Sequence, residues 1–165
     1  HPDVSHLNMK PKTLIIIFCI VGLLGGAFAK MWLDVPSDQE LIRETLSEAT
    51  RNGREGKPGG VLDYLSGGFK IGDYEPDSAD ISEFIKTQKP EVTVVAPNPV
   101  IRGEVAEIIS PVEIKFGIGN IGTTQTIEGV RVVLHKESGL RYGIFPTPRW
   151  KIVEVTTPTG NPFGQ

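Results

Sequence analysis

The spacing of hydrophobic and polar positions changes twice along the chain, and each change predicts a different kind of structure. Residues 13–29 carry no charge and are almost continuously apolar, which is typical of a helix that enters a membrane. From Ser37 to about Asn52 apolar residues return every three or four positions, as on a surface helix. Beyond Glu91 β-branched residues alternate with polar ones, which predicts strands.

The apolar segment has the features of a transmembrane helix and also those of an export signal. Extended through Leu33 it is long enough to cross the hydrocarbon layer, and Trp32 suits the membrane interface. Lys10 and Lys12 predict a cytoplasmic N-terminus and a periplasmic or extracellular domain. The competing interpretation is a cleaved signal peptide, because Ala27-Phe28-Ala29 has the small-x-small form of a cleavage site. The sequence favours neither the transmembrane anchor nor the cleaved signal peptide, and we take the retained anchor as the working hypothesis.

A stripe of small residues in the apolar segment predicts contact with a second helix. Gly22 and Gly26 form a G-x-x-x-G pair, which permits close approach of helices. The alternative, equally weighted, is that small residues simply accumulate at the end of an export signal. For a retained anchor, the residues expected to pack in the membrane are Cys19, Gly22, Gly26, Ala29 and Trp32.

The first part of the exported domain is predicted to be helical. Ser37 is suited to cap a helix that runs to about Asn52, and Glu40 completes a capping box. The helical spacing of apolar side chains predicts one buried and one polar face. The buried face comprises Leu41, Ile42, Thr45, Leu46 and Ala49, and the polar face Arg43, Glu44, Ser47 and Arg51.

Two shorter helices are expected next. The segment VLDYLSGGF, residues 61–69, predicts a second helix that ends at Gly67 and Gly68. A third is predicted over residues 78–88, with Ser78 as its N-cap. The chain leaves it at Pro90, and its expected buried face comprises Ile81, Phe84 and Ile85.

The last part of the domain predicts an antiparallel sheet. Short turns separate the β-branched segments, so neighbouring strands should pair as a meander. The stretch GIGNIG, residues 117–122, lacks the following helix of a dinucleotide fingerprint and is interpreted as a hairpin with Asn120 at its turn. The expected strands are residues 92–96, 101–110, 112–118, 126–136, 142–145 and 149–156. The predicted fold class is α+β: three N-terminal helices on a curved antiparallel sheet, preceded by one transmembrane helix.

These elements divide the chain into four parts. A short cytoplasmic segment (1–12) precedes the transmembrane helix (13–33), and the α+β domain (34–157) precedes an extended tail (158–165). The tail is rich in Pro, Gly and Thr, which favours extended chain. It is interpreted either as a frayed terminus or as a segment that lies along a neighbouring subunit through Pro158, Pro162 and Phe163.

The order of the elements resembles the NTF2-like (SnoaL-like, cystatin-like cone) superfamily. The resemblance covers about Ser37 to Thr157 and rests on the first amphipathic helix, the glycine-containing break before VLDYLSGGF, the third helix, the strand segment VIRGEVAEI and the closing RWKIVEV. It implies a cone with a pocket between sheet and helices. Some relatives use this pocket as an isomerase, cyclase or dehydratase site, and others bind protein partners.

Composition narrows the possible functions. The net charge of −3 over 165 residues, without a cluster of Lys and Arg, argues against a nucleic-acid-binding surface. The single cysteine, Cys19, permits neither an intrachain disulfide nor a cysteine metal site. The three histidines are scattered, so a zinc site is not expected. No ligand set for haem, chlorophyll or an iron–sulfur cluster is present in the sequence, and no cofactor is expected.

Candidate chemistry is limited to a few side chains. An isomerase mechanism of the kind implied by the resemblance needs an ionised carboxylate and a Tyr or protonated Asp donor. The pocket candidates are Tyr64, Asp63 and Tyr74, although none maps onto a family catalytic residue, and Tyr64 is more simply interpreted as a half-buried aromatic on the sheet.

Other titratable residues are expected to be structural. His135 lies near the end of a predicted strand, which favours an edge-exposed imidazole over a proton shuttle. Glu104 and Glu107 should point to opposite faces of one strand, which argues against a paired-carboxylate mechanism.

We therefore expect a non-catalytic accessory or assembly subunit of a larger membrane protein complex, for example a photosynthetic or respiratory one. Its anchor would lie in the lipid bilayer against integral membrane partners, and its exported domain would bind protein. The alternative is a membrane-tethered SnoaL-like enzyme or small apolar-ligand-binding protein, and a third hypothesis is a secreted domain that keeps its signal. Convergent polar side chains in the pocket would favour ligand chemistry, whereas an apolar filling would favour scaffolding.

Overall fold

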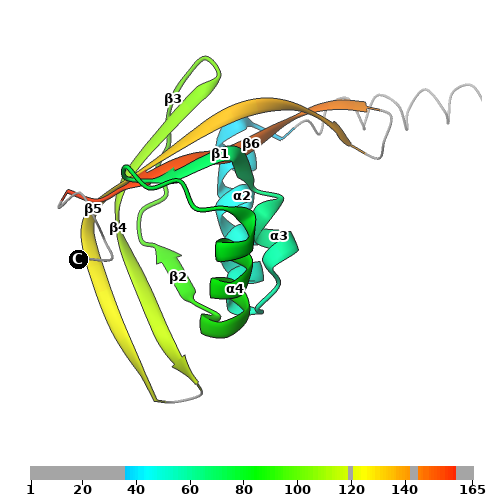
Figure 1. Cartoon of the computed structure of the whole chain (residues 1–165). Coiled ribbons are helices and arrows are strands. Elements are labelled where there is room, and N and C mark those ends of the chain that lie inside the picture. Colours follow the sequence, from blue (N-terminus) through cyan, green and yellow to red (C-terminus); the bar gives the residue numbers. More distant parts are fainter. Residues whose placement is uncertain (1–35, 119–120, 142–144, 159–165) are drawn as a thin grey trace, which may run out of the picture. The chain divides into compact units, whose positions relative to one another are not determined.

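The computed structural model describes residues 36–118, 121–141 and 145–158 (Figure 1). The expected transmembrane helix, residues 13–33, and the tail beyond Pro158 lie outside these ranges. So do all the expected packing residues of the anchor, namely Cys19, Gly22, Gly26, Ala29 and Trp32. Among the residues that are described, no helix has both the length and the apolarity that a membrane crossing requires.

The described residues form helices followed by a sheet, with one early strand between the helices. The helices are α2 (Asp38–Arg54), α3 (Pro58–Leu62) and α4 (Ser78–Gln88). The strands are β1 (Leu65–Ile71), β2 (Glu91–Val94), β3 (Val100–Arg102), β4 (Val105–Ile118), β5 (Ile121–Arg141) and β6 (Phe145–Thr156). The α+β class predicted from the sequence is confirmed.

The strands form one curved, mixed sheet. Its order is β1-β6-β5-β4-β2, and β3 pairs with part of β4 beside this path (Figure 1). β2, β3, β4, β5 and β6 pair antiparallel, as predicted, but β1 runs parallel to β6. The prediction of a purely antiparallel sheet is therefore wrong for β1.

The strand β1 replaces the end of the predicted second helix. Its Gly67 and Gly68 have low helix propensity, so this segment gains little from continuing α3. Instead Leu65 lies opposite Ile152 and Ile71 opposite Val155 in β6. A partner more than eighty residues away in the sequence thus decides the local structure.

Helix α2 begins and packs as its sequence predicts. The Ser37 hydroxyl accepts a hydrogen bond from the Glu40 N–H (3.3 Å), and the Glu40 carboxylate accepts one from the Ser37 N–H (2.8 Å). This capping box satisfies two N–H groups that a helix start leaves unpaired. The helix ends at Arg54, two residues later than predicted. Its buried residues are Ile42, Thr45, Leu46, Ala49 and Gly53.

Contacts with Trp150 fix α2 across the inner face of the sheet. Trp150 is 1% exposed, and its indole Nε1–H donates to the Asp38 carboxylate (3.1 Å). The same carboxylate accepts from the Lys136 Nζ (3.0 Å), which also lies 5.8 Å from the centre of the indole ring. About two turns further along, the Thr45 hydroxyl donates to the Trp150 carbonyl (3.1 Å). The start of α2 is thereby held against β5 and β6.

Helix α4 differs from its prediction in its cap and its buried face. The N-cap is Asp77 rather than Ser78, because the Asp77 carboxylate accepts from the Asp80 N–H (2.8 Å). Of the expected face only Ile85 is fully buried, while Phe84 is 38% exposed. The helix is therefore buried less deeply than its sequence predicted.

The long strands β4 and β5 pass through a bulge at Pro111. The sequence predicted a break there, but β4 continues, with Ser110 opposite Val130 and Val112 opposite Ile127. Gly129 takes a φ of 65° in the bulge, a conformation that costs other residues energy. Pro111 has no N–H to donate. It is tolerated here because the bulge interrupts the hydrogen-bond ladder between the strands at this position.

The hairpins that join β4, β5 and β6 agree in part with the predicted strands. The GIGNIG stretch forms the predicted hairpin pairing, with Gly117 opposite Gly122, while Asn120 lies outside the described residues. The strand predicted over residues 142–145 is not separate: β6 begins at Phe145, opposite Arg141 of β5. Residues 142–144 lie outside the described ranges.

Candidate functional site

The inner face of the sheet and α2 enclose a cavity of about 260 Å³. Six elements contribute to its wall, through Leu46 (α2), Phe69 (β1), Val94 (β2), Val112 (β4), Ile127 (β5) and Val155 (β6), among others. The wall forms because the strands alternate, so that every second side chain faces the helix. This is the pocket between sheet and helices that the family resemblance implied.

The lining of the cavity is almost wholly apolar. The polar side chains among the described lining residues are Thr50, Gln125 and Thr157, and none of them is ionisable. The Thr50 hydroxyl donates to the Ser47 carbonyl (3.0 Å), so it is already used within α2. The cavity can therefore hold an apolar group and orient it weakly, but its lining offers no acid or base for proton transfer.

The three pocket candidates from the sequence all lie outside this lining. Tyr64 packs half-buried against the core, as its simpler interpretation predicted, and burial, together with nearby carboxylates, raises the pKa of its phenol. Asp63 is exposed at the end of α3. Tyr74 is 57% exposed and donates to the Asp80 carboxylate (3.0 Å), which raises the pKa of its phenol.

The remaining titratable candidates also differ in part from their predictions. His135 is exposed, but it lies within β5 between Val105 of β4 and Lys151 of β6, so it is not on a sheet edge. Glu104 lies in the turn before β4 rather than on the strand, where the positive φ of Gly103 (62°) reverses the chain. Glu107 does lie on β4.

Glu107 has a structural partner on the neighbouring strand. Its carboxylate accepts a hydrogen bond from the Arg131 Nε (2.6 Å). This ion pair lies on the outer face of the sheet, away from the cavity. The hydrogen bond that the Arg131 guanidinium donates to this carboxylate raises the pKa of the guanidinium. The two carboxylates singled out in the sequence therefore form no pair with each other.

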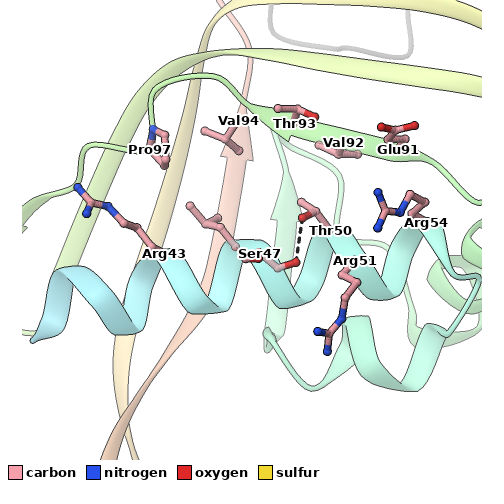
Figure 2. Close-up of a pocket in the computed structure, with 11 residues that line it drawn as sticks. Arg43, Ser47, Thr50, Arg51, Arg54, Glu91, Val92, Thr93, Val94 and Pro97 are labelled. Carbon is pink, nitrogen blue, oxygen red and sulfur yellow. Dashed lines mark hydrogen bonds between the residues drawn. The ribbon is translucent and has the colours of Figure 1, made fainter. Parts of the chain in front are cut away.

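A second concavity, of about 370 Å³, lies between α2 and the edge strand β2 (Figure 2). We call it the α2–β2 groove. Arg43, Arg51 and Arg54 line it from the helix, and Glu91 to Val94 and Pro97 line it from the other side. Arg51 is paired with Glu48 on its own helix. Figure 2 shows Arg43 at the Pro97 end of the groove and Arg54 at the Glu91 end.

Both concavities include residues that the sequence did not single out as functional. Phe69 and Ile71 were missed because the segment before them was interpreted as a helix, although their spacing of two positions is that of a strand face. The sequence predicts Arg43 on the polar face of α2, and in the structure its side chain is exposed. Its place in a groove depends on the approach of β2, which no local pattern encodes.

Comparison with known proteins supports the fold. No protein-family model matches the sequence, and comparison with curated proteins gives no match. Among solved structures, the CaMKII hub of S. rosetta is 14% identical with a TM-score of 0.54, over 73% of this chain and 95% of the hub. An NTF2-like protein with a cystatin-like fold from Novosphingobium aromaticivorans is 13% identical with a TM-score of 0.52, over 85% of this chain and 92% of that protein.

At these identities the likeness concerns the fold alone. It spans almost the whole length of both solved proteins. The part of the chain that the structure describes therefore has the NTF2-like (SnoaL-like) cone fold.

Proposed function

We propose that this chain is a non-catalytic accessory or assembly subunit of a larger membrane protein complex, whose cone is the protein-binding domain. One observation supports a binding role over catalysis: the cone's cavity is lined by apolar side chains and by no ionisable group among the described residues. Isomerase, cyclase and dehydratase chemistry requires a positioned acid or base, which such a lining does not supply.

The membrane part of the proposal rests on the sequence. The uncharged segment 13–29 with Lys10 and Lys12 before it supports an anchor whose domain lies on the non-cytoplasmic side. Gly22 and Gly26 would allow that anchor to pack closely against a helix of the host complex.

Gentle purification from native membranes tests this proposal. In a mild non-ionic detergent the chain should migrate in an assembly far larger than its own 18.0 kDa, as measured by native gel or native mass spectrometry. The variant Gly22→Ile/Gly26→Ile should leave that assembly, because bulky side chains block close helix contact. Leu24→Phe enlarges the opposite side of the same helix and is the matched control. An unsubstituted chain that migrates alone would refute the proposal.

A second candidate function is binding of a small apolar molecule, and the cavity favours it. Its volume of about 260 Å³ is close to the lower end of common ligand pockets, at about 300 Å³. The polarity-sensitive dye N-phenyl-1-naphthylamine should then bind with increased fluorescence. Val112→Phe should abolish the increase by filling the cavity, whereas Val105→Phe on the outer face should not. Equal binding by both variants would refute this candidate.

A further inference from the structure

The α2–β2 groove carries positive charge that is only partly balanced, by Glu40 near Arg43 and by Glu55 near Arg54. Arg43 and Arg54 are exposed, and neither forms an ion pair with any residue that the structure describes. The third arginine, Arg51, is paired with Glu48, and its side chain points away from β2 in Figure 2. The groove's own carboxylate, Glu91, is 3.6 Å from the Lys115 Nζ.

The two free arginines lie on one side of α2 and mark the ends of the groove. They are eleven residues apart, which is about three helical turns, so their side chains leave the helix in nearly the same direction. Their Cα atoms are separated by roughly 16 Å along the axis, at about 1.5 Å per residue. Figure 2 shows the Arg43 and Arg54 side chains at opposite ends of the groove, and in this arrangement one small anion does not reach both.

The opposite wall of the groove is an unpaired strand edge. In the part of the chain that the structure describes, β2 ends the sheet and pairs with β4 alone, through positions from Glu91 opposite Lys115 to Val94 opposite Val112. The Val95 N–H donates to the Pro111 carbonyl (3.1 Å), which makes Val94 and Val112 a non-hydrogen-bonded pair. The backbone N–H and C=O groups of Val92 and Val94 therefore point away from β4.

The middle of the groove combines an apolar strip with small polar side chains. Between the two arginines its lining includes apolar Leu46, Val92 and Val94 and polar Ser47, Thr50 and Thr93. A ligand that matches the whole groove therefore needs hydrogen-bonding backbone for the strand edge, an apolar group for the middle and a negative charge at each end. An extended peptide supplies all three, because it can add to an exposed edge as a further strand.

We propose that the α2–β2 groove binds an extended segment of a partner protein with two acidic residues four positions apart and an apolar residue midway. In a strand, positions i, i+2 and i+4 face the same side, and i and i+4 are about 13 Å apart. The flexible arginine side chains span the remaining few ångströms and form charge-assisted hydrogen bonds with the carboxylates. The inference rests on the proposed protein-binding function and names its surface and partner chemistry.

Fluorescence polarisation with two short peptides tests the inference. The acidic probe is fluorescein-labelled Gly-Glu-Thr-Val-Thr-Glu-Gly and the control is Gly-Gln-Thr-Val-Thr-Gln-Gly, each titrated with the full chain in a mild non-ionic detergent. We expect the acidic peptide to bind about tenfold more tightly at low salt, as expected for two partly exposed ion pairs. The difference should shrink as salt is added, because exposed charges are screened.

Charge substitutions assign the binding to the groove. Arg43→Gln/Arg54→Gln should remove the preference for the acidic peptide, whereas Arg102→Gln, at an exposed arginine on β3, should keep it. Arg43→Glu/Arg54→Glu should prefer the peptide Gly-Lys-Thr-Val-Thr-Lys-Gly instead. These variants change exposed side chains and leave the core of α2 unaltered.

Three results would overturn the inference: equal binding of the acidic and Gln peptides, an unchanged preference in the Arg43→Gln/Arg54→Gln variant, or displacement by inorganic phosphate beyond that by sodium chloride of equal ionic strength. Any of them, in a chain that still purifies in a larger assembly, leaves the proposed function standing. A chain that purifies alone yet binds the acidic peptide would instead remove the proposed function and retain the site.

Discussion

Removing the charge of Asp38 should lower the free energy of unfolding of the domain, because its carboxylate accepts hydrogen bonds from two partners. The carboxylate accepts hydrogen bonds from the Lys136 Nζ (3.0 Å) and the Trp150 Nε1–H (3.1 Å). Asp38→Asn keeps an oxygen for the indole and loses the ion pair, whereas Asp38→Ala loses both. The two substitutions therefore separate the contribution of charge from that of the buried donor.

The expected magnitudes follow from exposure. The side chains of Asp38 and Lys136 are 31% and 30% exposed, so their pair is partly screened by water. A charge-assisted hydrogen bond, discounted for this screening, gives a loss of about 1 kcal/mol for Asp38→Asn. Asp38→Ala also leaves an indole donor unpaired in a ring that is 1% exposed. A buried donor without a partner costs about 1–2 kcal/mol more, so the total is about 2–3 kcal/mol.

The dependence of this difference on pH has a definite sign. Burial alone would raise the pKa of the Asp38 carboxyl, but the hydrogen bonds from Lys136 and Trp150 and the Lys136 charge outweigh it and lower this pKa. A carboxyl with a lowered folded-state pKa stabilises the fold above its unfolded pKa, near about pH 4. That contribution is lost as the pH falls through the folded-state pKa. The deficit of Asp38→Asn should thus be constant between about pH 5 and 8 and narrow below about pH 4.

Urea unfolding of the full chain in a mild detergent, followed by tryptophan fluorescence, measures these differences. Lys136→Met provides the control, because it removes the ion pair and the contact of the Lys136 Nζ with the indole ring but leaves the bond between Asp38 and the indole. Its loss should match that of Asp38→Asn or exceed it by up to about 1 kcal/mol, the usual size of such a cation–π contact. Equal losses for Asp38→Asn and Asp38→Ala, or a deficit for Asp38→Asn that does not narrow at all as the pH falls below about 4, would refute the reasoning.

Three further substitutions test the cap, the bulge and a buried hydroxyl by the same unfolding measurement. Ser37→Ala should lower the free energy of unfolding by about 1 kcal/mol, because the Glu40 N–H loses its acceptor, and Ser37→Asp should restore it. Gly129→Ala should cost about 1–2 kcal/mol, because alanine at a φ of 65° is strained; no loss would contradict the bulge geometry. Ser110→Ala should cost about 1–3 kcal/mol, because the Ala96 N–H donates to this 2% exposed hydroxyl (2.9 Å), and Ser110→Thr should retain part of it.

The sequence predicts those elements whose signals are local. Helix α2 combines a capping box at Ser37 with apolar residues at helical spacing, and both features refer only to neighbours within a few residues. The hairpin at residues 117–122 likewise joins adjacent segments. For such elements the pattern and the final packing depend on the same residues, so the prediction and the structure agree.

The errors arise where a distant partner decides the outcome. The sequence predicts a helix over residues 61–69 that ends at Gly67 and Gly68. Pairing with Ile152 and Val155 instead makes Leu65–Ile71 the strand β1. His135 was placed on an edge because strand order cannot be inferred from spacing within one strand. The groove was missed for the same reason, since Arg43 becomes part of a wall only after β2 has joined the far end of the sheet.

The cavity and the α2–β2 groove share part of their lining. Leu46 and Thr50 of α2 and Val92 and Val94 of β2 line both concavities. Because close-packed side chains transmit displacement to their neighbours, a strand added to β2 would act on the same residues that bound the cavity. The fold therefore provides a short physical route by which a partner in the groove could alter the space available to an apolar group.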